Sequence, residues 1–276
     1  MVYRMKARSI IPQVGIPNDD FTLYHGDFFN SWKDLPRNFD LILTDPPYNI
    51  LQQTQSWDKE IDFKELEYIF DEILKPFGLV IIFCDLNLML QLMTEWTEKL
   101  NYKHYHIWKK TGGMPVSKKR PINNAEFILV FRKAGIREKE LTFNPFEMGV
   151  IGQAYFKRNS TPDIPTRRMK KTKVNINKTG KRFSKVIIEA PNKPNMERWE
   201  RSNHPTQKPE ILLRKLIRGY SNKGGMILDP FAGSGSTIIS SLKEERQAIG
   251  FEKNEDYFNE AEMRINGVIK QENLFR

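Results

Sequence analysis

The segment MILDPFAGSG, residues 226–235, decides the fold class of this 276-residue chain. Its first residues, Met226–Leu228, form a short apolar run that predicts a buried strand, and Thr237 begins a stretch typical of a helix. Between them lies a turn with two glycines, which allow a backbone to come close to a bound ligand. A strand, a glycine-bearing turn and a helix in this order are typical of an α/β domain.

A carboxylate follows this turn at an informative distance. Glu252 lies nineteen residues after Gly233, at the end of the next predicted strand, Ala248–Phe251. An acidic residue at this offset suits a ribose with free hydroxyl groups. The dinucleotide pattern G-x-G-x-x-G is incomplete, because Ile238 occupies the position of its third glycine. The turn and the glutamate predict a cofactor that carries a ribose; the alternative is a tight turn with a surface glutamate.

Strands and helices alternate on both sides of this segment. Helices are predicted at 62–74, at 86–99, from Pro209 and from about Asn254. Further strands are predicted at Phe21–Tyr24, Phe39–Leu43, Leu79–Cys84, Tyr105–Trp108 and Glu126–Phe131. The alternation predicts an α/β fold with a doubly wound, mostly parallel sheet. A polar and basic stretch, residues 134–203, interrupts it and is expected to be an inserted small domain or loop system.

Basic residues are concentrated in one part of the chain. The whole chain has 44 Lys and Arg against 34 Asp and Glu, a formal charge of +10. Residues 151–203 hold 14 of the basic and 4 of the acidic side chains, so this segment carries the entire excess. Such a concentration suggests a polyanionic partner, with a solvated basic surface as the alternative.

Cysteine and histidine usage indicates neither disulfides nor metal sites. Cys84 is the single cysteine, so no disulfide can form within the chain, which suits a reducing compartment. The four histidines have no metal-ligand spacing with one another or with the cysteine, and we expect no bound metal. Since we find no signal peptide and no run long enough to span a membrane, we expect a cytoplasmic protein without membrane contact.

The segment TDPPYN, residues 44–49, directly follows a predicted strand. Pro46 and Pro47 make it rigid and remove two N–H donors, which leaves it rich in hydrogen-bond acceptors. The carboxylate of Asp45 and the carbonyl of Pro46 could hold both protons of an aromatic amine, a poor nucleophile that needs positioning and charge stabilisation. Tyr48 offers a flat face on which a base could stack. The alternative is a rigid loop with a capping aspartate.

A third cluster, HPTQKP at residues 204–209, lies just before a predicted helix. Thr206 and Lys208 at a helix entrance could hold a carboxylate. Alone, this cluster would be unremarkable.

Together the three motifs resemble those of the amino-group DNA methyltransferases, which transfer a methyl group from S-adenosylmethionine to adenine N6 or cytosine N4. The catalytic motif comes first, the basic insert next and the cofactor loop last, an order similar to that of the circularly permuted β class. The resemblance covers residues 21–133 and 204–265. It implies a Rossmann-like sheet divided into a catalytic half, 1–133, a target-recognition insert, 134–203, and a cofactor half, 204–276.

The resemblance also implies roles for individual residues. Asp45 and Pro46, followed by Pro47, would bind the target amine, and Tyr48 would stack on the target base. Glu252 would hold the ribose of the cofactor. The implied cofactor-binding residues are Asp27 near the adenine, Thr206 and Lys208 at the carboxylate, Asp229 near the methionine amine, Phe231, Ala232, Gly233, Ser234, Gly235 and Glu252.

The basic insert would supply contacts to the phosphates of double-stranded DNA, and some of its arginines would read guanines. The candidates are Lys157, Arg158, Arg167, Arg168, Lys170, Lys171, Lys173, Lys181 and Arg182. In such a permuted sheet the strands ending at Asp229 and Thr44 are expected to be central neighbours. Their loops would then face each other across one crevice, although 188 residues separate Asp45 from Gly233.

The implied reaction is a direct attack by the amine of a flipped base on the sulfonium methyl group, without a covalent intermediate. A C5-cytosine enzyme would need a nucleophilic cysteine, and Cys84 is predicted to be buried. An aspartate before Pro-Pro-Tyr favours adenine within the family, whereas a serine there favours cytosine. Cytosine N4, an RNA substrate and a non-catalytic DNA-binding protein stay open as alternatives, as do a homodimer and a partner restriction endonuclease. A protein-glutamine methyltransferase would carry Asn before Pro-Pro-Tyr.

Overall fold

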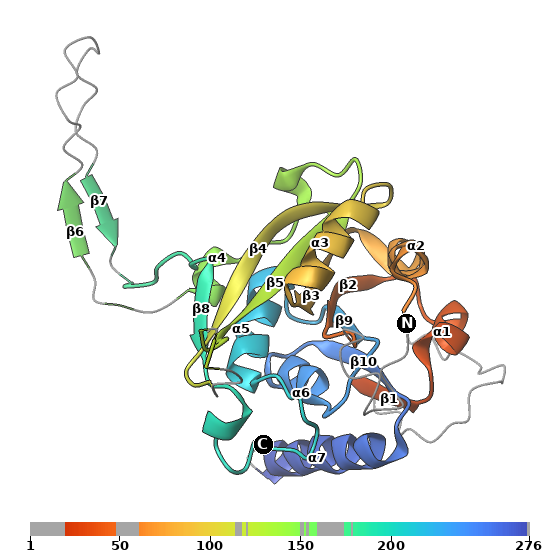
Figure 1. Cartoon of the computed structure of the whole chain (residues 1–276). Helices are drawn as coiled ribbons and strands as arrows, with labels where there is room; N and C mark the ends of the chain where they lie inside the picture. Colours follow the sequence, from red (N-terminus) through yellow and green to blue (C-terminus); the bar gives the residue numbers. More distant parts are fainter. Residues whose placement is uncertain are drawn as a thin grey trace.

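The computed structural model describes residues 20–47, 61–113, 118–119, 121–149, 152, 155–158, 174–177 and 179–274. These residues form one eight-stranded sheet and a separate two-stranded sheet (Figure 1). In spatial order, the strands of the large sheet are β1 (Phe21–His25), β10 (Gln247–Glu252), β9 (Met226–Asp229), β2 (Phe39–Thr44), β3 (Leu74–Cys84), β5 (Ala125–Lys133), β4 (Leu100–Lys110) and β8 (Ile187–Ala190). The first five are mutually parallel, β5 is antiparallel to β3 and β4, and β8 is parallel to β4.

The predicted α/β class and the central pair of strands are both confirmed. β2 pairs with β9 in parallel, with Leu41 opposite Ile227 and Ile42 opposite Leu228. From this pair the chain winds outward in opposite directions, to β3 on one side and to β10 on the other. Ligands of doubly wound sheets bind where the winding reverses, beyond the carboxyl ends of the strands.

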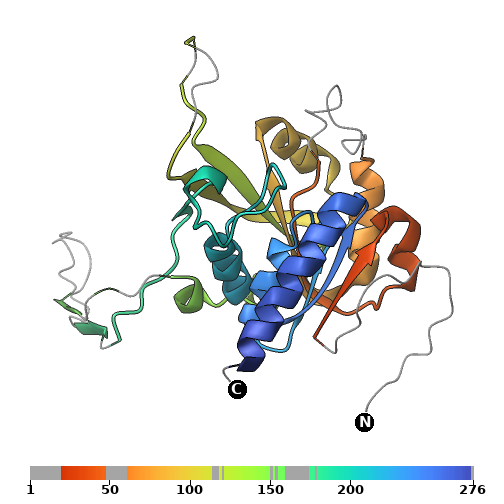
Figure 2. The same cartoon turned by 90° about the horizontal axis from the view of Figure 1, so that it is seen from below.

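Helices cover both faces of the large sheet. The helices of the described residues are α1 (Phe28–Ser31), α2 (Phe63–Ile73), α3 (Leu86–Glu95), α4 (Pro145–Met148), α5 (Glu210–Tyr220), α6 (Ser236–Lys243) and α7 (Glu255–Leu274), with short 3-10 helices at Trp32–Asp34, Glu138–Glu140 and Lys193–Asn195. The first three share a buried apolar cluster with one face, whereas α4 to α7 pack on the other. Figure 2 shows α7 running along the outside of this second layer. None of the helices that the structure describes is long and apolar enough to cross a membrane.

Successive residues of β3 explain why the sheet is covered on both faces. Val80 and Ile82 belong to the cluster under α2 and α3, and Ile81 and Phe83 to the cluster under α5. A strand buried on both faces is expected to be a continuous apolar run, as this one is. Cys84 lies within the first cluster and is fully buried, as predicted.

Two helices end earlier than their sequence patterns suggest. Asp62 caps α2 by accepting hydrogen bonds from the backbone N–H groups of Lys64 and Glu65 (2.9 and 3.1 Å), but β3 begins directly afterwards at Leu74. α3 ends at Glu95 rather than near Lys99. The next residue, Trp96, is buried and donates its indole N–H to the carbonyl of Phe63 (2.7 Å), so tertiary packing ends the helix.

Both ends of the expected insert, residues 134–203, belong to the main body. α4 buries Met148 against α5, and β8 extends the large sheet beside β4. Within the insert, β6 (Tyr155–Arg158) and β7 (Val174–Asn177) form an antiparallel pair that stands away from the body (Figure 1). Residues 134–203 therefore hold elements that pack on the main body as well as the β6–β7 pair.

Candidate active site

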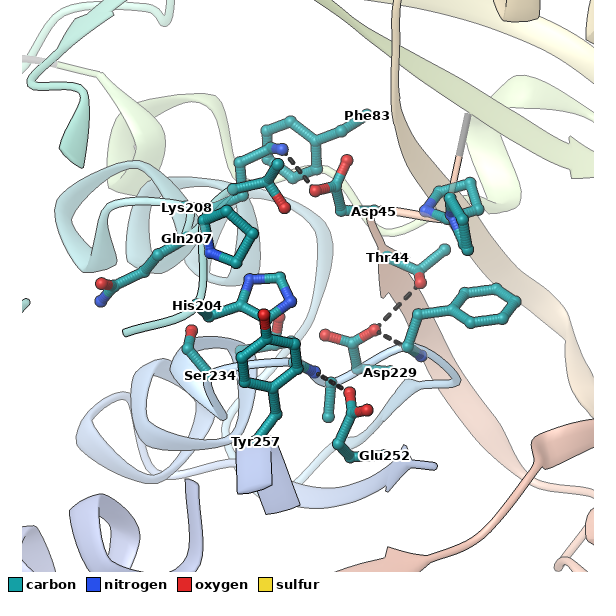
Figure 3. Close-up of a pocket in the computed structure, with 18 of the residues that line it drawn as sticks. Thr44, Asp45, Phe83, His204, Gln207, Lys208, Asp229, Ser234, Glu252 and Tyr257 are labelled. Atoms are coloured by element: carbon teal, nitrogen blue, oxygen red, sulfur yellow. Dashed lines mark hydrogen bonds and ion pairs between the residues drawn. The ribbon is translucent and has the colours of Figure 1, made fainter. Parts of the chain in front are cut away.

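A cavity of about 740 Å³ lies beyond the carboxyl ends of β2, β9 and β10. Figure 3 shows that side chains from both halves of the chain point into it. The predicted site residues that line it are Asp27, Asp45, Pro46, Pro47, Thr206, Lys208, Asp229, Phe231, Ala232, Gly233, Ser234 and Glu252. Gly235 lies behind the lining, at the start of α6, and Tyr48 falls outside the described residues.

Asp229, at the end of β9, is held by neutral donors. Its Oδ1 accepts hydrogen bonds from the hydroxyl of Thr44 (2.9 Å) and the backbone N–H of Phe231 (3.2 Å), and the side chain of Thr237 donates a further one. Burial raises the pKa of the Asp229 carboxyl to about 6, although these hydrogen bonds oppose the shift. The Thr44 bond ties β2, which precedes the TDPPYN segment, to β9, which precedes the glycine-bearing loop.

The loop after β9 depends on two left-handed glycines. Gly233 has φ +51°, and a Cβ at this position would come within 2.9 Å of His204 Nε2. Gly235 has φ +74°, and its Cβ would lie 3.1 Å from the Cβ of Ala261. Other residues would be strained at both positions, so only glycine at 233 and 235 allows the loop to pass between the HPTQKP segment and α7.

Glu252, at the end of β10, supports this loop. Its Oε2 accepts a hydrogen bond from the backbone N–H of Gly233 (2.9 Å), and its Oε1 accepts one from Asn254 (2.7 Å). Burial raises the pKa of Glu252, while the backbone donors favour its charged form. On the neighbouring strand end, Asp27 caps α1 by accepting from the N–H of Phe29 (3.0 Å).

Lys208 lies on the opposite side of the cavity and pairs with two carboxylates. Its Nζ is 2.5 Å from Asp45 Oδ2 and 3.1 Å from Glu126 Oε1 (Figure 3 draws the first pair). Glu126 is also 2.9 Å from the Nζ of Lys110. Burial disfavours the charged ammonium, but the two carboxylates outweigh it and raise the pKa of Lys208. In this structure Lys208 therefore contacts Asp45 of the TDPPYN segment, whereas the resemblance implied a ligand carboxylate.

Buried polar contacts fix the HPTQKP segment. The side chain of Gln207 accepts from the N–H of Ser202 (2.8 Å) and donates to the carbonyl of Glu200 (2.7 Å). The ring of His204 packs edge-on against Tyr257, with centroids 4.6 Å apart. Burial lowers the pKa of His204 to about 4, so the imidazole is neutral near pH 7.

Several residues that line the cavity were not predicted as site residues from the sequence. Thr44 and His204 lie inside quoted motifs and could have been found from them. Glu126 and Lys110 lie on the antiparallel strands β5 and β4, where no local motif marks them. Tyr257 of α7 had no distinguishing sequence signal.

The predicted DNA-binding residues either do not line this cavity or lie outside the residues that the structure describes. Lys181 pairs with Glu147 of α4 (2.7 Å), and Arg182 packs beside Gly152. Neither lines the cavity. Lys157 and Arg158 belong to β6, whose side chains are not described, and five further candidates lie outside the described residues: Arg167, Arg168, Lys170, Lys171 and Lys173.

Comparison with known proteins gives consistent matches over most of the chain. The sequence model of the family described as DNA methylase matches residues 39–263. Type II methyltransferase M.HpaI of Haemophilus parainfluenzae is 30% identical over 245 residues, covering 85% of this chain and 70% of the relative. DNA adenine methyltransferase YhdJ of Escherichia coli (strain K12) is 29% identical over 253 residues, covering 87% and 81%. The crystal structure of the M1.HpyAVI–SAM complex matches with a TM-score of 0.63 and 26% identity, covering 89% of this chain and 99% of that one.

Proposed function

Because this chain belongs to the DNA methylase family, we propose that it methylates N6 of adenine within a short sequence of double-stranded DNA. The chain is an S-adenosylmethionine-dependent DNA methyltransferase that acts on exocyclic amino groups. One observation carries the proposed chemistry: Asp45 and the glycine loop after Asp229 face one cavity, and Thr44 ties their strands together.

The cavity residues fit S-adenosylmethionine. Asp229 is a buried carboxylate and Glu252 a partly buried one, and both are held by hydroxyl or backbone donors. Within the described residues neither forms an ion pair with Lys or Arg. Asp229 would hold the methionine ammonium, and Glu252 the ribose hydroxyls, beside a loop that Gly233 keeps free of a Cβ. The chemistry that the cofactor supplies when bound is an activated methyl group on a positively charged sulfur.

The catalytic motif would position the amine. The carboxylate of Asp45 and the carbonyl of Pro46 accept the two N–H groups of a base swung out of the duplex. The amine nitrogen would bond to the methyl carbon as the bond from that carbon to the sulfonium sulfur breaks, and S-adenosylhomocysteine would leave as a neutral thioether. The Asp45 carboxylate would stabilise the positive charge that develops on the nitrogen, which then loses one proton to solvent. Burial raises the pKa of Cys84 far above its usual range, so its thiol does not supply the nucleophile that C5 methylation of cytosine requires.

Two observations support adenine over cytosine. The motif begins with Asp45, and an aspartate at this position favours adenine in the family that the sequence resembles. YhdJ, which aligns with 87% of the chain, is a DNA adenine methyltransferase. Cytosine N4 is the alternative, because its amine has similar geometry.

DNA contacts are proposed for the basic part of the insert. Its excess of Lys and Arg would neutralise phosphates, and binding should then weaken steeply as salt rises. The arm formed by β6 and β7 belongs to this region and projects from the body (Figure 1). We assign target recognition to it.

Methylation mapping by single-molecule sequencing tests the proposal. DNA from cells that express the chain would be compared with DNA from cells that express Asp45→Ala. N6-methyladenine at one short motif, absent from the control, is the expected result. N4-methylcytosine would overturn the base assignment. No modification in either sample, from folded protein, would favour a non-catalytic DNA-binding protein.

A further inference from the structure

Four charged side chains of alternating sign line the catalytic side of the cavity. Asp45 pairs with Lys208 (2.5 Å), Lys208 with Glu126 (3.1 Å) and Glu126 with Lys110 (2.9 Å). They come from the end of β2, the segment before α5, the start of β5 and the end of β4. The side chains of Lys208 and Glu126 are 9% and 11% exposed, so solvent screens their interaction weakly.

No sequence motif assigns Glu126 or Lys110, and of these two Glu126 is the one that contacts Lys208 directly. Burial opposes its charge, but Lys208 and Lys110 outweigh burial and lower its pKa. It therefore stays ionised near pH 7 and competes with Asp45 for the ammonium of Lys208. A single lysine is thus shared between the catalytic carboxylate and a second carboxylate behind it.

Building on the proposed function, we propose that Glu126 is a positioning residue for methyl transfer, which acts through Lys208. Glu126 shares the Lys208 ammonium with Asp45, which weakens the Lys208–Asp45 interaction, and it fixes the ammonium beside the catalytic motif. Without Glu126, Lys208 would pair with Asp45 alone and neutralise it more completely. The carboxylate would then stabilise less of the positive charge that develops on the target amine.

A double-mutant cycle tests this arrangement, since it separates a direct effect from one transmitted through Lys208. The proteins are wild type, Glu126→Gln, Lys208→Met and the double variant, assayed as full-length chains on target DNA. Glu126→Gln is expected to lower kcat by about 10- to 100-fold, the range typical of a misplaced catalytic group. The KM values for S-adenosylmethionine and DNA should change by less than about 2-fold, because Glu126 contacts neither in this scheme.

On the Lys208→Met background, the same Glu126→Gln change should lower kcat by less than about 3-fold, since nothing is left to transmit it. Glu72→Gln is the matched control. It removes an equivalent charge from an ion pair with Arg37 (2.9 Å) that lies outside the cavity lining. Its kcat should equal that of wild type.

Three results would overturn the inference: an unchanged kcat in Glu126→Gln, an equal loss on both backgrounds, or a loss confined to KM. If Glu126→Gln does not fold, Glu126→Asp replaces it, because the shorter carboxylate keeps the charge and changes only its distance from Lys208. The cycle holds for adenine and cytosine targets, since Asp45 serves either amine. A wild-type chain that transfers no methyl group would instead overturn the proposed function, and this inference with it.

Discussion

The two sides of the cavity hold their carboxylates in different ways. On the side that we propose binds the cofactor, Asp229 and Glu252 accept hydrogen bonds from hydroxyl and backbone N–H groups. On the side that we propose is catalytic, Asp45 and Glu126 pair with lysines. A carboxylate oriented by neutral donors keeps its negative charge for a cationic ligand, whereas one paired with lysine has much of that charge balanced within the protein.

This difference predicts that the two sides can be separated by substitution. Changes on the cofactor side should weaken S-adenosylmethionine binding, and changes on the catalytic side should slow transfer from a cofactor that still binds. Measurements of cofactor affinity and of kcat on the same variants therefore test the comparison directly.

The largest effect is expected for Asp45→Asn. The amide keeps the shape of the side chain but loses the charge that stabilises the attacking amine, so kcat should fall by about 10²- to 10³-fold. Cofactor affinity, measured by calorimetry, should stay within about 3-fold of wild type, since loss of one remote contact has a small effect. A large loss of affinity would show that the two sides are not separate.

Glu252→Gln should come next and affect the other quantity. Its carboxylate supports Gly233 and is proposed to hold the ribose, and hydrogen bonds to charged groups contribute about 1.5–3 kcal/mol. We expect the dissociation constant for S-adenosylmethionine to rise by about 10- to 100-fold. At saturating cofactor, kcat should recover. A kcat that stays low at saturation would contradict the division.

The pH dependence of cofactor binding should reveal Asp229. Its pKa, raised by burial to about 6, means that the carboxyl becomes neutral as the pH falls through this value, and a neutral carboxyl does not attract an ammonium. Affinity should therefore fall by up to about 10-fold per pH unit below pH 6. Titration calorimetry at a series of pH values from about 5 to about 8 would measure this change in affinity. Asp229→Asn should bind S-adenosylmethionine weakly and without this pH dependence. If the affinity of the wild-type protein does not change over the range, the assignment is wrong.

Thr44→Val should have the smallest effect. Valine keeps the branched shape in a buried position but removes the hydrogen bond to Asp229, worth about 0.5–1.5 kcal/mol. Cofactor affinity should fall by about 3- to 10-fold. Thr44→Ser keeps the hydroxyl and serves as control. Equal losses in both variants would point to packing rather than to the hydrogen bond.

The fold could be predicted from the sequence because two of its motifs lie directly after strands. TDPPYN follows β2 and the glycine loop follows β9, and parallel strands bring their carboxyl ends to the same edge of a sheet. The adjacency of these two strands, predicted from the permuted order of motifs, is confirmed by their pairing. The position of these two motifs in the sheet could therefore be predicted from the sequence alone.

The partners of Lys208 could not be read in the same way. Glu126 appeared only as the first residue of a predicted strand, and its position in the cavity follows from the antiparallel register that sets it opposite Trp108. A register between distant strands is fixed by packing of the whole sheet, which no local spacing records. The same reason explains why the edge strand β8 was not predicted within the polar and basic stretch 134–203.

The pairing of β2 with β9 also has a consequence for synthesis of the chain. The two strands are joined by the Thr44–Asp229 bond, which spans 185 residues of sequence. At a translation rate of about 5–20 residues per second, the ribosome needs roughly ten to forty seconds to release the second strand after the first. Throughout this interval one edge of β2 has no partner in the native sheet, and an unpaired apolar edge is a template for aggregation. The order of the motifs along the chain therefore leaves this edge of β2 exposed until the segment that contains β9 has been synthesised.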